Sequence, residues 1–491
     1  EKLRDCSWAF CPRWKEQLVA MVMVEDETPT SQRSDSLDPD IFGAVMEDID
    51  VQSLDEETQR FVLETHMENL GLFDFLGVEL ANLASQYSNY EQLPNVRAAG
   101  PRNLDKLGDG STFVTLVKSF MGIGILTMPY AIKQGGYVAG PVGLIGICFL
   151  EWYCIELLIV TSQTSGARTV SFGGLGEKIC GRWAKTMVNV SLLVTQFGVC
   201  VAYVVFISAN VADVVCHETR SVACPAKVAI AVGMLVWVLP FCLLKTLSML
   251  AVPMLMSNFA ILGVVAWVFY CAFTQLESQS VAPEIVPINW DGLPVFFGCV
   301  VFAFEGIGLI MPIQAVMAEP AHMSQLLKWA MIFLCVLYSS FGFLCYLGYG
   351  VDTADMVTFN IPQGKITSFL RLFYCFGISF TYPVMIFPIF GLVESRFRRL
   401  KGSRGCGPRV LERASIICLT GVIAMNIPNF GLFLGLIGSL ACSALAFVFP
   451  ALFHWRGAHQ GTVTGKQKAK DIALILFGSI CGVFSFIMTF I

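Results

Sequence analysis

The sequence predicts an all-α polytopic membrane protein with eleven transmembrane helices, on three observations. Of its 491 residues, 55% are hydrophobic and only 14% are charged, whereas about a quarter of the residues of a soluble domain are charged. Eleven apolar windows follow residue 110, most of them near the length of about 20 residues that crosses a hydrocarbon core roughly 30 Å thick. Basic residues also concentrate in alternate connections between these windows.

Residues 1–110 are predicted to be an acidic, mostly disordered cytosolic region, and residues 111–491 a transmembrane domain. Residues 25–92 contain 17 Asp and Glu residues but only Arg33 and Arg60 as basic residues. A segment of this charge, without a long apolar run, cannot bury enough surface to offset the entropy of ordering. A docking or autoinhibitory role with a cytosolic partner is a second interpretation of this region.

The predicted spans are separated by charged or polar connections. Arg182 and Lys185 precede the third window, Lys227 begins the fourth, and the basic run 396–413 follows the eighth. The ninth window is the shortest. In chain order the spans cover residues 112–133, 142–161, 187–215, 227–244, 249–274, 293–317, 327–350, 366–394, 414–426, 430–453 and 471–491.

The distribution of positive charge predicts the orientation. One set of alternate connections carries 17 Lys and Arg residues, whereas the opposite set carries only Lys133, Arg220, Lys227 and Lys365. Cytosolic connections are the ones enriched in Lys and Arg, so the N-terminus is predicted to be cytosolic. Eleven crossings then place Ile491 outside the cell or in an organelle lumen, and the membrane is either the plasma membrane or a vacuolar or lysosomal membrane.

Two of the 18 cysteines differ from the rest. Most lie singly in apolar windows, where Cys behaves as a small hydrophobic residue. Cys216 and Cys224 instead flank a polar connection on the side predicted to be non-cytosolic, where disulfides persist. They are a candidate disulfide, and two free thiols are the alternative.

The first and sixth windows share an interruption. The first reads KSFMGIGILTMPY from Lys118, and the sixth reads FEGIGLIMP from Phe304. Glycine permits an unwound backbone and Pro suits the first turn of a restarting helix, so each window can form two half-helices. Tight helix packing through glycine is the alternative. Interruptions five helices apart favour a five-plus-five inverted repeat, in which broken helices surround a substrate site near the bilayer midplane.

The broken helices suit a zwitterion such as an α-amino acid. The half-helix that restarts near Ile125 directs free N–H groups at a carboxylate, while carbonyls freed at residues 119–121 and 304–306 accept from an ammonium group. In the third window, Gln196 and Tyr203 lie two turns apart on one face. The predicted substrate-binding residues are Ser119, Met121, Gly122, Gly124, Ile125, Gln196, Tyr203, Phe304, Gly306 and Gly308.

Ion coupling is predicted at Glu305, because a carboxylate inside a membrane is costly and therefore a functional candidate. A structural Glu that ties the unwound helix to its neighbours is the alternative. Ser379 and Thr381 could offer hydroxyl oxygens to a cation, or could bond back to helical carbonyls. The other intramembrane acids, Glu151 and Glu156, are expected to pair with Lys118 or Arg371.

Residues 118–136 and the segment AFEGIGLIMPIQAVMAEP from Ala303 resemble signature segments of the amino acid/auxin permease family. LPFCLLKTLSMLAVP from Leu239, FTYPVMIFP from Phe380 and GLIGSLACSALAFVFPALFH from Gly435 also match its pattern. The resemblance covers residues 110–491. It implies an amino acid transporter of the APC superfamily, with a five-plus-five core, a peripheral eleventh helix, and most similarity to the proton-coupled and vacuolar branches. Sodium-coupled relatives carry an Asn in the approach to the first break, where this chain has Lys118 and Ser119, so protons are favoured over sodium.

These observations predict a secondary active transporter of small or medium neutral amino acids, with a proton or sodium gradient as its driving force. The sequence contains no Walker motif, no His-Glu-x-x-His and no nucleophile with a plausible His partner, so an enzyme is not expected. We also expect no cofactor, no metal and no nucleic-acid partner. An amino acid sensor that binds substrate and signals through its N-terminal region, with little or no flux, is the alternative.

Overall fold

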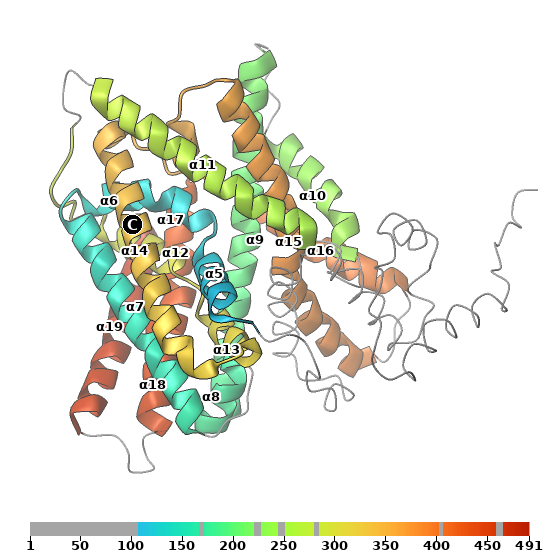
Figure 1. The fold of residues 1–491 in the computed structure, drawn as a ribbon. Coiled ribbons are helices and arrows are strands. Elements are labelled where there is room, and N and C mark those ends of the chain that lie inside the picture. The colour runs from blue at the N-terminus through green and yellow to red at the C-terminus, as the bar shows by residue number, and fades with distance from the viewer. Residues whose placement is uncertain are drawn as a thin grey trace, which may run out of the picture. The chain divides into compact units, whose positions relative to one another are not determined.

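The computed structural model describes residues 107–165, 171–219, 227–243, 251–278, 284–401, 406–457 and 465–490. These residues are helical wherever they have regular structure, and their sole β-pairing is an isolated bridge between Leu107 and Met317. The all-α prediction is therefore confirmed for them (Figure 1). The acidic leader up to residue 106 lies outside the described residues, and so do its predicted disorder and Cys224.

The helices follow the predicted spans in order. They are α5 (Asp109–Phe120), η3 (Ile123–Thr127), α6 (Met128–Gly135), α7 (Ala139–Thr164), α8 (Phe172–Cys180), α9 (Arg182–Thr219), α10 (Lys227–Leu243), α11 (Ala251–Ser278), α12 (Leu293–Ala303), α13 (Ile307–Val316), η5 (Pro320–His322), α14 (Met323–Tyr349), η6 (Gly350–Asp352), η7 (Val357–Phe359), α15 (Lys365–Lys401), α16 (Cys406–Met425), α17 (Phe430–Ile437), η8 (Gly438–Cys442), η9 (Ala444–Val448), α18 (Phe449–Gly457) and α19 (Gly465–Phe490).

The predicted number of spans is only partly reproduced. Among the described residues, eight helical segments are long and apolar enough to cross a membrane, and the bent pair α5 and η3–α6 makes a ninth. α10 is apolar but shorter, and α16, in the place of the ninth window, is not among them. The count of eleven therefore stays a prediction, although every predicted window coincides with a helix.

Several boundaries differ from the predicted windows. α9 and α15 extend over 38 and 37 residues, beyond windows 187–215 and 366–394, because a helix continues past the apolar stretch from which its window was recognised. The short helix α8 was not predicted. Ser171 caps its start by accepting a hydrogen bond from the Gly174 N–H at 3.1 Å, and Gly181, with φ 87°, ends it.

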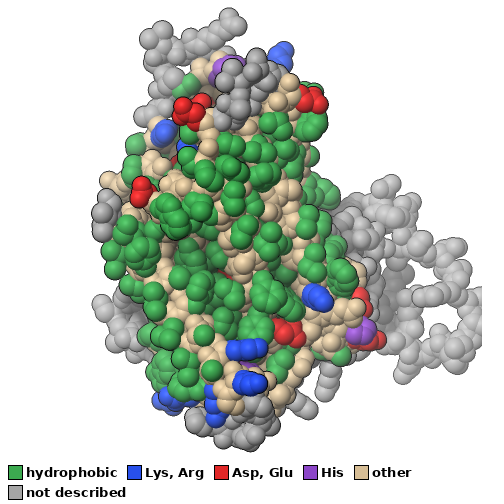
Figure 2. All heavy atoms as spheres, turned by 90° about the vertical axis from the view of Figure 1, so that its left-hand side faces the viewer, with side chains coloured by type: hydrophobic (Ala, Val, Ile, Leu, Met, Phe, Trp, Pro, Cys, Tyr) green, Lys and Arg blue, Asp and Glu red, His purple; other side chains and the backbone are tan. Residues whose placement is uncertain are grey.

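The broken sixth span lies at the centre of the helices, and α19 lies at their edge. Of the most apolar stretch of Leu293–Val316, 78% is buried, against 22% for Gly465–Thr489. The exposed side chains of α7 and α19 include Val142, Phe149, Leu476 and Ile480. Figure 2 shows hydrophobic side chains over the middle of one face, with Lys and Arg side chains toward its lower end. A surface of this kind suits contact with lipid.

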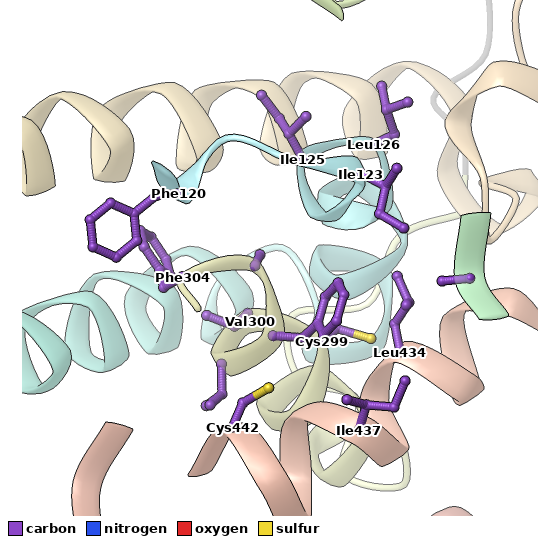
Figure 3. Packing of buried hydrophobic residues seen from close by; sticks show 14 of the residues in the cluster. Phe120, Ile123, Ile125, Leu126, Cys299, Val300, Phe304, Leu434, Ile437 and Cys442 are labelled. Atoms are coloured by element: carbon purple, nitrogen blue, oxygen red, sulfur yellow. The ribbon is translucent and has the colours of Figure 1, made fainter. Parts of the chain in front are cut away.

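α12 packs closely on α17 and η8. A Cβ on Gly298 would collide with the Gly435 carbonyl, and one on Gly438 would collide with the Gly298 carbonyl. The two backbones therefore touch without side chains between them, as small residues allow in membrane helices. Figure 3 shows the apolar side chains that the first span, α12, α17 and η8 contribute to the core beside this contact.

Candidate functional site

The first span is broken as predicted. α5 ends at Phe120, Met121 and Gly122 have extended backbone, and a 3-10 helix leads into α6, where Pro129 lies in the first turn. The two halves of the span are bent by 49°. The Tyr338 hydroxyl donates to the Phe120 carbonyl at 2.9 Å, so one carbonyl freed by the break is satisfied by α14.

The sixth span is broken at the matching place. α12 ends at Ala303, and α13 begins at Ile307 after three residues outside the helix. A Cβ on Gly124 would lie 2.9 Å from the Ala303 Cα, and one on Gly306 would lie 2.6 Å from the Phe120 ring. The glycines on either side therefore let the two breaks pack directly against each other.

A cavity of about 240 Å³ lies at the two breaks. α5, η3, α9, α11, α12, α13 and α15 contribute to its walls. Its volume is below the roughly 300–1,000 Å³ of sites for drug-sized ligands, so it suits a small molecule. On α9 the lining runs from Asn189 to Tyr203, and on α15 from Tyr374 to Pro388. The cavity thus extends from the breaks toward the end of the helices at which α5 and α9 begin.

The structure brings most of the predicted site residues to this cavity. The predicted residues that line it are Ser119, Met121, Gly122, Gly124, Gln196, Tyr203, Gly306 and Gly308, together with Glu305 and Thr381 from the predicted coupling site. Their roles in binding and coupling remain proposals.

Three predicted residues do not line the cavity. Ile125 is fully buried in the apolar core, where Figure 3 shows it pointing away from Cys299. Phe304 is 1% exposed, and its ring centroid lies 5.1 Å from that of Tyr338. The Ser379 hydroxyl donates to the Phe376 carbonyl at 2.6 Å and accepts from the Trp237 indole at 3.2 Å. These side chains fill packing positions next to the site, because every turn of a buried helix also faces its neighbours.

Several polar side chains at the cavity were not predicted, and two of them are amides with unpartnered atoms. Asn189 on α9 and Asn258 on α11 line it, and the Asn189 Oδ1 and Asn258 Nδ2 atoms are buried with no partner among the described residues. Gln196 Oε1 and Glu305 Oε2 are likewise buried without a partner among the described residues. Asn189, Gln196 and Tyr203 repeat every seven residues, a spacing that places them on one helical face and could have revealed Asn189. Buried polar atoms without partners at a cavity are the groups that a polar ligand would satisfy.

The amino acid sequence from residue 106 to residue 491 matches the family model described as "Transmembrane amino acid transporter protein". The chain belongs to this family. The amino acid transporter AVT3B of Arabidopsis thaliana is 32% identical over 384 residues, which cover 76% of this chain and 90% of that protein. Vacuolar amino acid transporter 4 of Saccharomyces cerevisiae is 26% identical over 433 residues, which cover 82% of this chain and 59% of the yeast protein. The resemblance inferred from the broken helices is therefore confirmed.

Two solved structures are similar to this member of the amino acid transporter family. MhsT in complex with L-phenylalanine is 12% identical, with a TM-score of 0.45, and the match covers 77% of this chain and 98% of that one. A Na⁺-coupled sialic acid symporter is also 12% identical with a TM-score of 0.45, and the match covers 85% of this chain and 95% of that one.

In this amino acid transporter chain, an ion pair between a buried Arg and a partly exposed Asp lies beyond the cavity. Arg371 on α15 is 1% exposed, and its Nη1 lies 2.7 Å from Asp213 Oδ2 on α9. Its Nε also donates to Asn210 Oδ1 at 3.0 Å. The expectation that Arg371 pairs with Glu151 or Glu156 was therefore wrong, because α15 packs against α9 and faces its acid.

At the opposite end of the cavity, the start of α5 is joined to the connection after α13. The Leu107 N–H donates to the Val316 carbonyl at 3.0 Å, and the Ala318 N–H donates to the Leu107 carbonyl at 2.9 Å. His322 Nδ1 lies 2.8 Å from Asp109 Oδ2. The half-helices α5 and α13 are thus linked at their outer ends as well as at the breaks.

Cys216, the first member of the predicted disulfide, is disulfide-bonded. The other member, Cys224, lies outside the described residues, so the pairing of the two stays a prediction.

Proposed function

We propose that this chain is a proton-coupled secondary transporter of small and medium neutral amino acids, which works by alternating access around the cavity at the two breaks. The observation that carries the proposal is the cavity itself. It lies between the ends of four half-helices and has buried polar atoms without partners on three of its walls.

The chemistry of the walls suits a neutral zwitterion. Backbone N–H groups at the start of η3 are available for a carboxylate, because the first N–H groups of a helix have no partner within it. Glu305 Oε2 and Gln196 Oε1 can accept from an ammonium group. Leu192, Ile261 and Met385 supply apolar wall for the side chain. Among the described residues that line the cavity, Lys118 and Glu305 are the charged ones. Their formal charges cancel, as the two charges of a neutral zwitterion do.

Proton coupling is supported by two features of the same site. Glu305 is the acid at the cavity wall among the described residues, and its unpartnered oxygen can bind a proton from water in the cavity. Ser379, a hydroxyl predicted to serve a cation, is turned toward Phe376 and Trp237. Thr381 bonds back to the Gly377 carbonyl at 3.4 Å. Sodium needs several oxygen ligands at one point, and these hydroxyls do not supply them together.

We place the chain in a vacuolar or lysosomal membrane, with its N-terminus in the cytosol. The yeast relative's name as a vacuolar transporter supports this location, and the charge asymmetry of the connections supports the orientation. With that orientation, the cavity extends toward the cytosol and the Arg371–Asp213 pair lies on the lumenal side. The structure then corresponds to a cytosol-facing state, and a lumen-facing state completes the cycle.

Reconstitution tests the proposal. Purified chain in proteoliposomes should accumulate radiolabelled L-alanine when a proton gradient is imposed with the amino acid on the acidic side, and should only equilibrate it without the gradient. Glu305→Gln should lose accumulation but retain alanine exchange. Glu156→Gln, on α7 and away from the cavity, is the matched control and should behave as wild type. Alanine binding without flux under any ion gradient would contradict transport and support the sensor.

A further inference from the structure

One nitrogen of the Arg371 guanidinium, Nη2, has no hydrogen-bond partner among the described residues. Its Nε donates to Asn210 and its Nη1 pairs with Asp213, but its Nη2 atom is buried without a partner. A guanidinium carries five N–H donors and is costly to bury unless they are satisfied. Because the Arg371 side chain is only 1% exposed, its unpaired Nη2 can be satisfied by an additional hydrogen-bond acceptor.

Arg371 lies immediately beyond the cavity. Tyr374, one turn further along α15, lines the cavity, and so does Tyr203 on α9, two turns before Asn210 on the same helical face. The bond between Arg371 and Asn210 thus spans the next layer after the tyrosines, on the side away from the start of α5.

One segment covers this layer. Residues 350–363, between α14 and α15, contain η6 and η7, and η7 contacts η3 at the first break. From this segment the Phe359 ring lies over the guanidinium, with its centroid 5.2 Å from Cζ. Gln363 donates to Asp213 at 2.9 Å, and Asn210 donates to the Met356 sulfur at 3.7 Å. We call residues 350–363 the lumenal cover.

We infer that Arg371 binds the α-carboxylate of the amino acid as it enters from the lumen, when the lumenal cover moves away. The inference rests on the proposed function, because it takes an amino acid as the cargo. A guanidinium binds a carboxylate through charge-assisted hydrogen bonds, and Asp213 and Asn210 hold Arg371 so that Nη2 remains for the ligand. The carboxylate then passes from Arg371 to the N–H groups at the start of η3.

The contact with Phe359 controls access to Arg371 from the lumen. A ring over a guanidinium stabilises the cation and excludes water from that face. While the cover is in place, Arg371 is closed to the lumen, and it is not among the residues that line the cavity. Arg371 should therefore act on substrate that arrives from the lumen and not on substrate that arrives from the cytosol.

The test compares alanine transport from the two faces of the reconstituted chain. Arg371→Gln should raise the KM for lumenal alanine by about tenfold or more, the size expected for loss of a hydrogen bond to a charged group. The KM for cytosolic alanine should stay at the wild-type value. Arg371→Lys keeps the charge but not the planar set of donors, so its KM for lumenal alanine should lie between those of wild type and Arg371→Gln. Lys365→Gln, an exposed cation at the start of the same helix, should leave both KM values unchanged. An equal rise from both faces, or a fall in kcat with neither KM changed, would overturn the inference and leave Arg371 a structural role.

A binding measurement separates this inference from failure of transport, since it needs no flux. Phe359→Ala removes the ring over Arg371, and should increase the preference of the purified chain for alanine over ethylamine, which lacks the carboxylate. The double variant Phe359→Ala/Arg371→Gln should lose that gain. If Phe359→Ala gains nothing, or if the gain survives in the double variant, Arg371 is not a carboxylate-binding residue.

Discussion

Substitution by Ala should have different effects at two glycines of the first break: loss of stability at Gly124 and loss of amino acid binding at Gly122. Gly124 and Gly122 lie two residues apart, and both line the cavity. A Cβ on Gly124 would lie 2.9 Å from the Ala303 Cα and 3.1 Å from its Cβ, so backbone would have to shift. A Cβ on Gly122 would meet nothing within 4 Å, and it would occupy the space that we assign to the ligand.

The expected size of each effect follows from these contacts. Forcing an extra methyl group into a packed interior costs about 1–3 kcal/mol. Replacing Gly by Ala also restricts the unfolded chain, which offsets about 0.4–1 kcal/mol where the backbone is compatible. Gly124→Ala should therefore destabilise the chain by about 1–2 kcal/mol on balance. Gly122→Ala, whose φ of −132° is open to Ala, should leave stability unchanged or slightly raised and should weaken amino acid binding.

Thermal unfolding of the detergent-purified chain, with and without alanine, measures both effects. Gly124→Ala should melt at a lower temperature than wild type in the absence of alanine. Gly122→Ala should melt like wild type without alanine. It should gain less stability on addition of alanine, because the stabilisation by a ligand at a given concentration falls as its dissociation constant rises. A Gly124→Ala variant as stable as wild type would refute the direct packing of the two breaks. Full stabilisation of Gly122→Ala by alanine would refute a ligand beside Gly122.

Three further substitutions test the surroundings of the site by the same unfolding assay. Tyr338→Phe removes the donor to the buried Phe120 carbonyl while it keeps the ring, and should cost about 1–3 kcal/mol; an unchanged melting temperature would contradict that hydrogen bond. Asp213→Ala leaves the buried Arg371 without its counter-charge. It should cost roughly 3–5 kcal/mol, toward the lower value because Asp213 is partly exposed. The double variant Arg371→Met/Asp213→Leu should recover much of the loss, and no recovery would contradict the ion pair. Gly298→Ala should destabilise the chain strongly, because its Cβ would meet the backbone of α17. Gly233→Ala, with open space around its Cβ, should not. Equal losses of stability in the two variants would contradict the close contact between α12 and α17.

Much of the fold could be predicted from the sequence because the bilayer imposes a strong pattern. Apolar length predicted the order of the helices, and the repeated Gly-Ile-Gly located both breaks. Two details were wrong: the first span restarts at Ile123 and not near Ile125, and Pro312 lies inside α13 and not in its first turn. The family match confirms the function class that these breaks indicated. Lengths of α9 and α15 were underestimated, because nothing in hydropathy marks the end of a helix that continues into water.

Side-chain direction could not be predicted from spacing alone. Ile125 and Phe304 lie within two residues of cavity-lining positions but face the core, because the unwound turns change the angle between successive residues. The partner of Arg371 depended on which helices meet in space, and the sequence does not encode that neighbour relation locally. Asn258 carried no periodic signal, since the other amide of α11, Gln275, lies far from it near the end of the helix. These are tertiary relations, and they decide which polar groups meet at the cavity.

A structure of the chain with a bound neutral amino acid would test the central claim most directly. We predict alanine in the cavity at the two breaks, with its carboxylate at the N–H groups after Gly122 and its ammonium group within hydrogen-bond distance of Glu305 or Gln196. Alanine bound at saturating concentration anywhere else, with the space between Gly122 and Glu305 filled by water alone, would contradict the account.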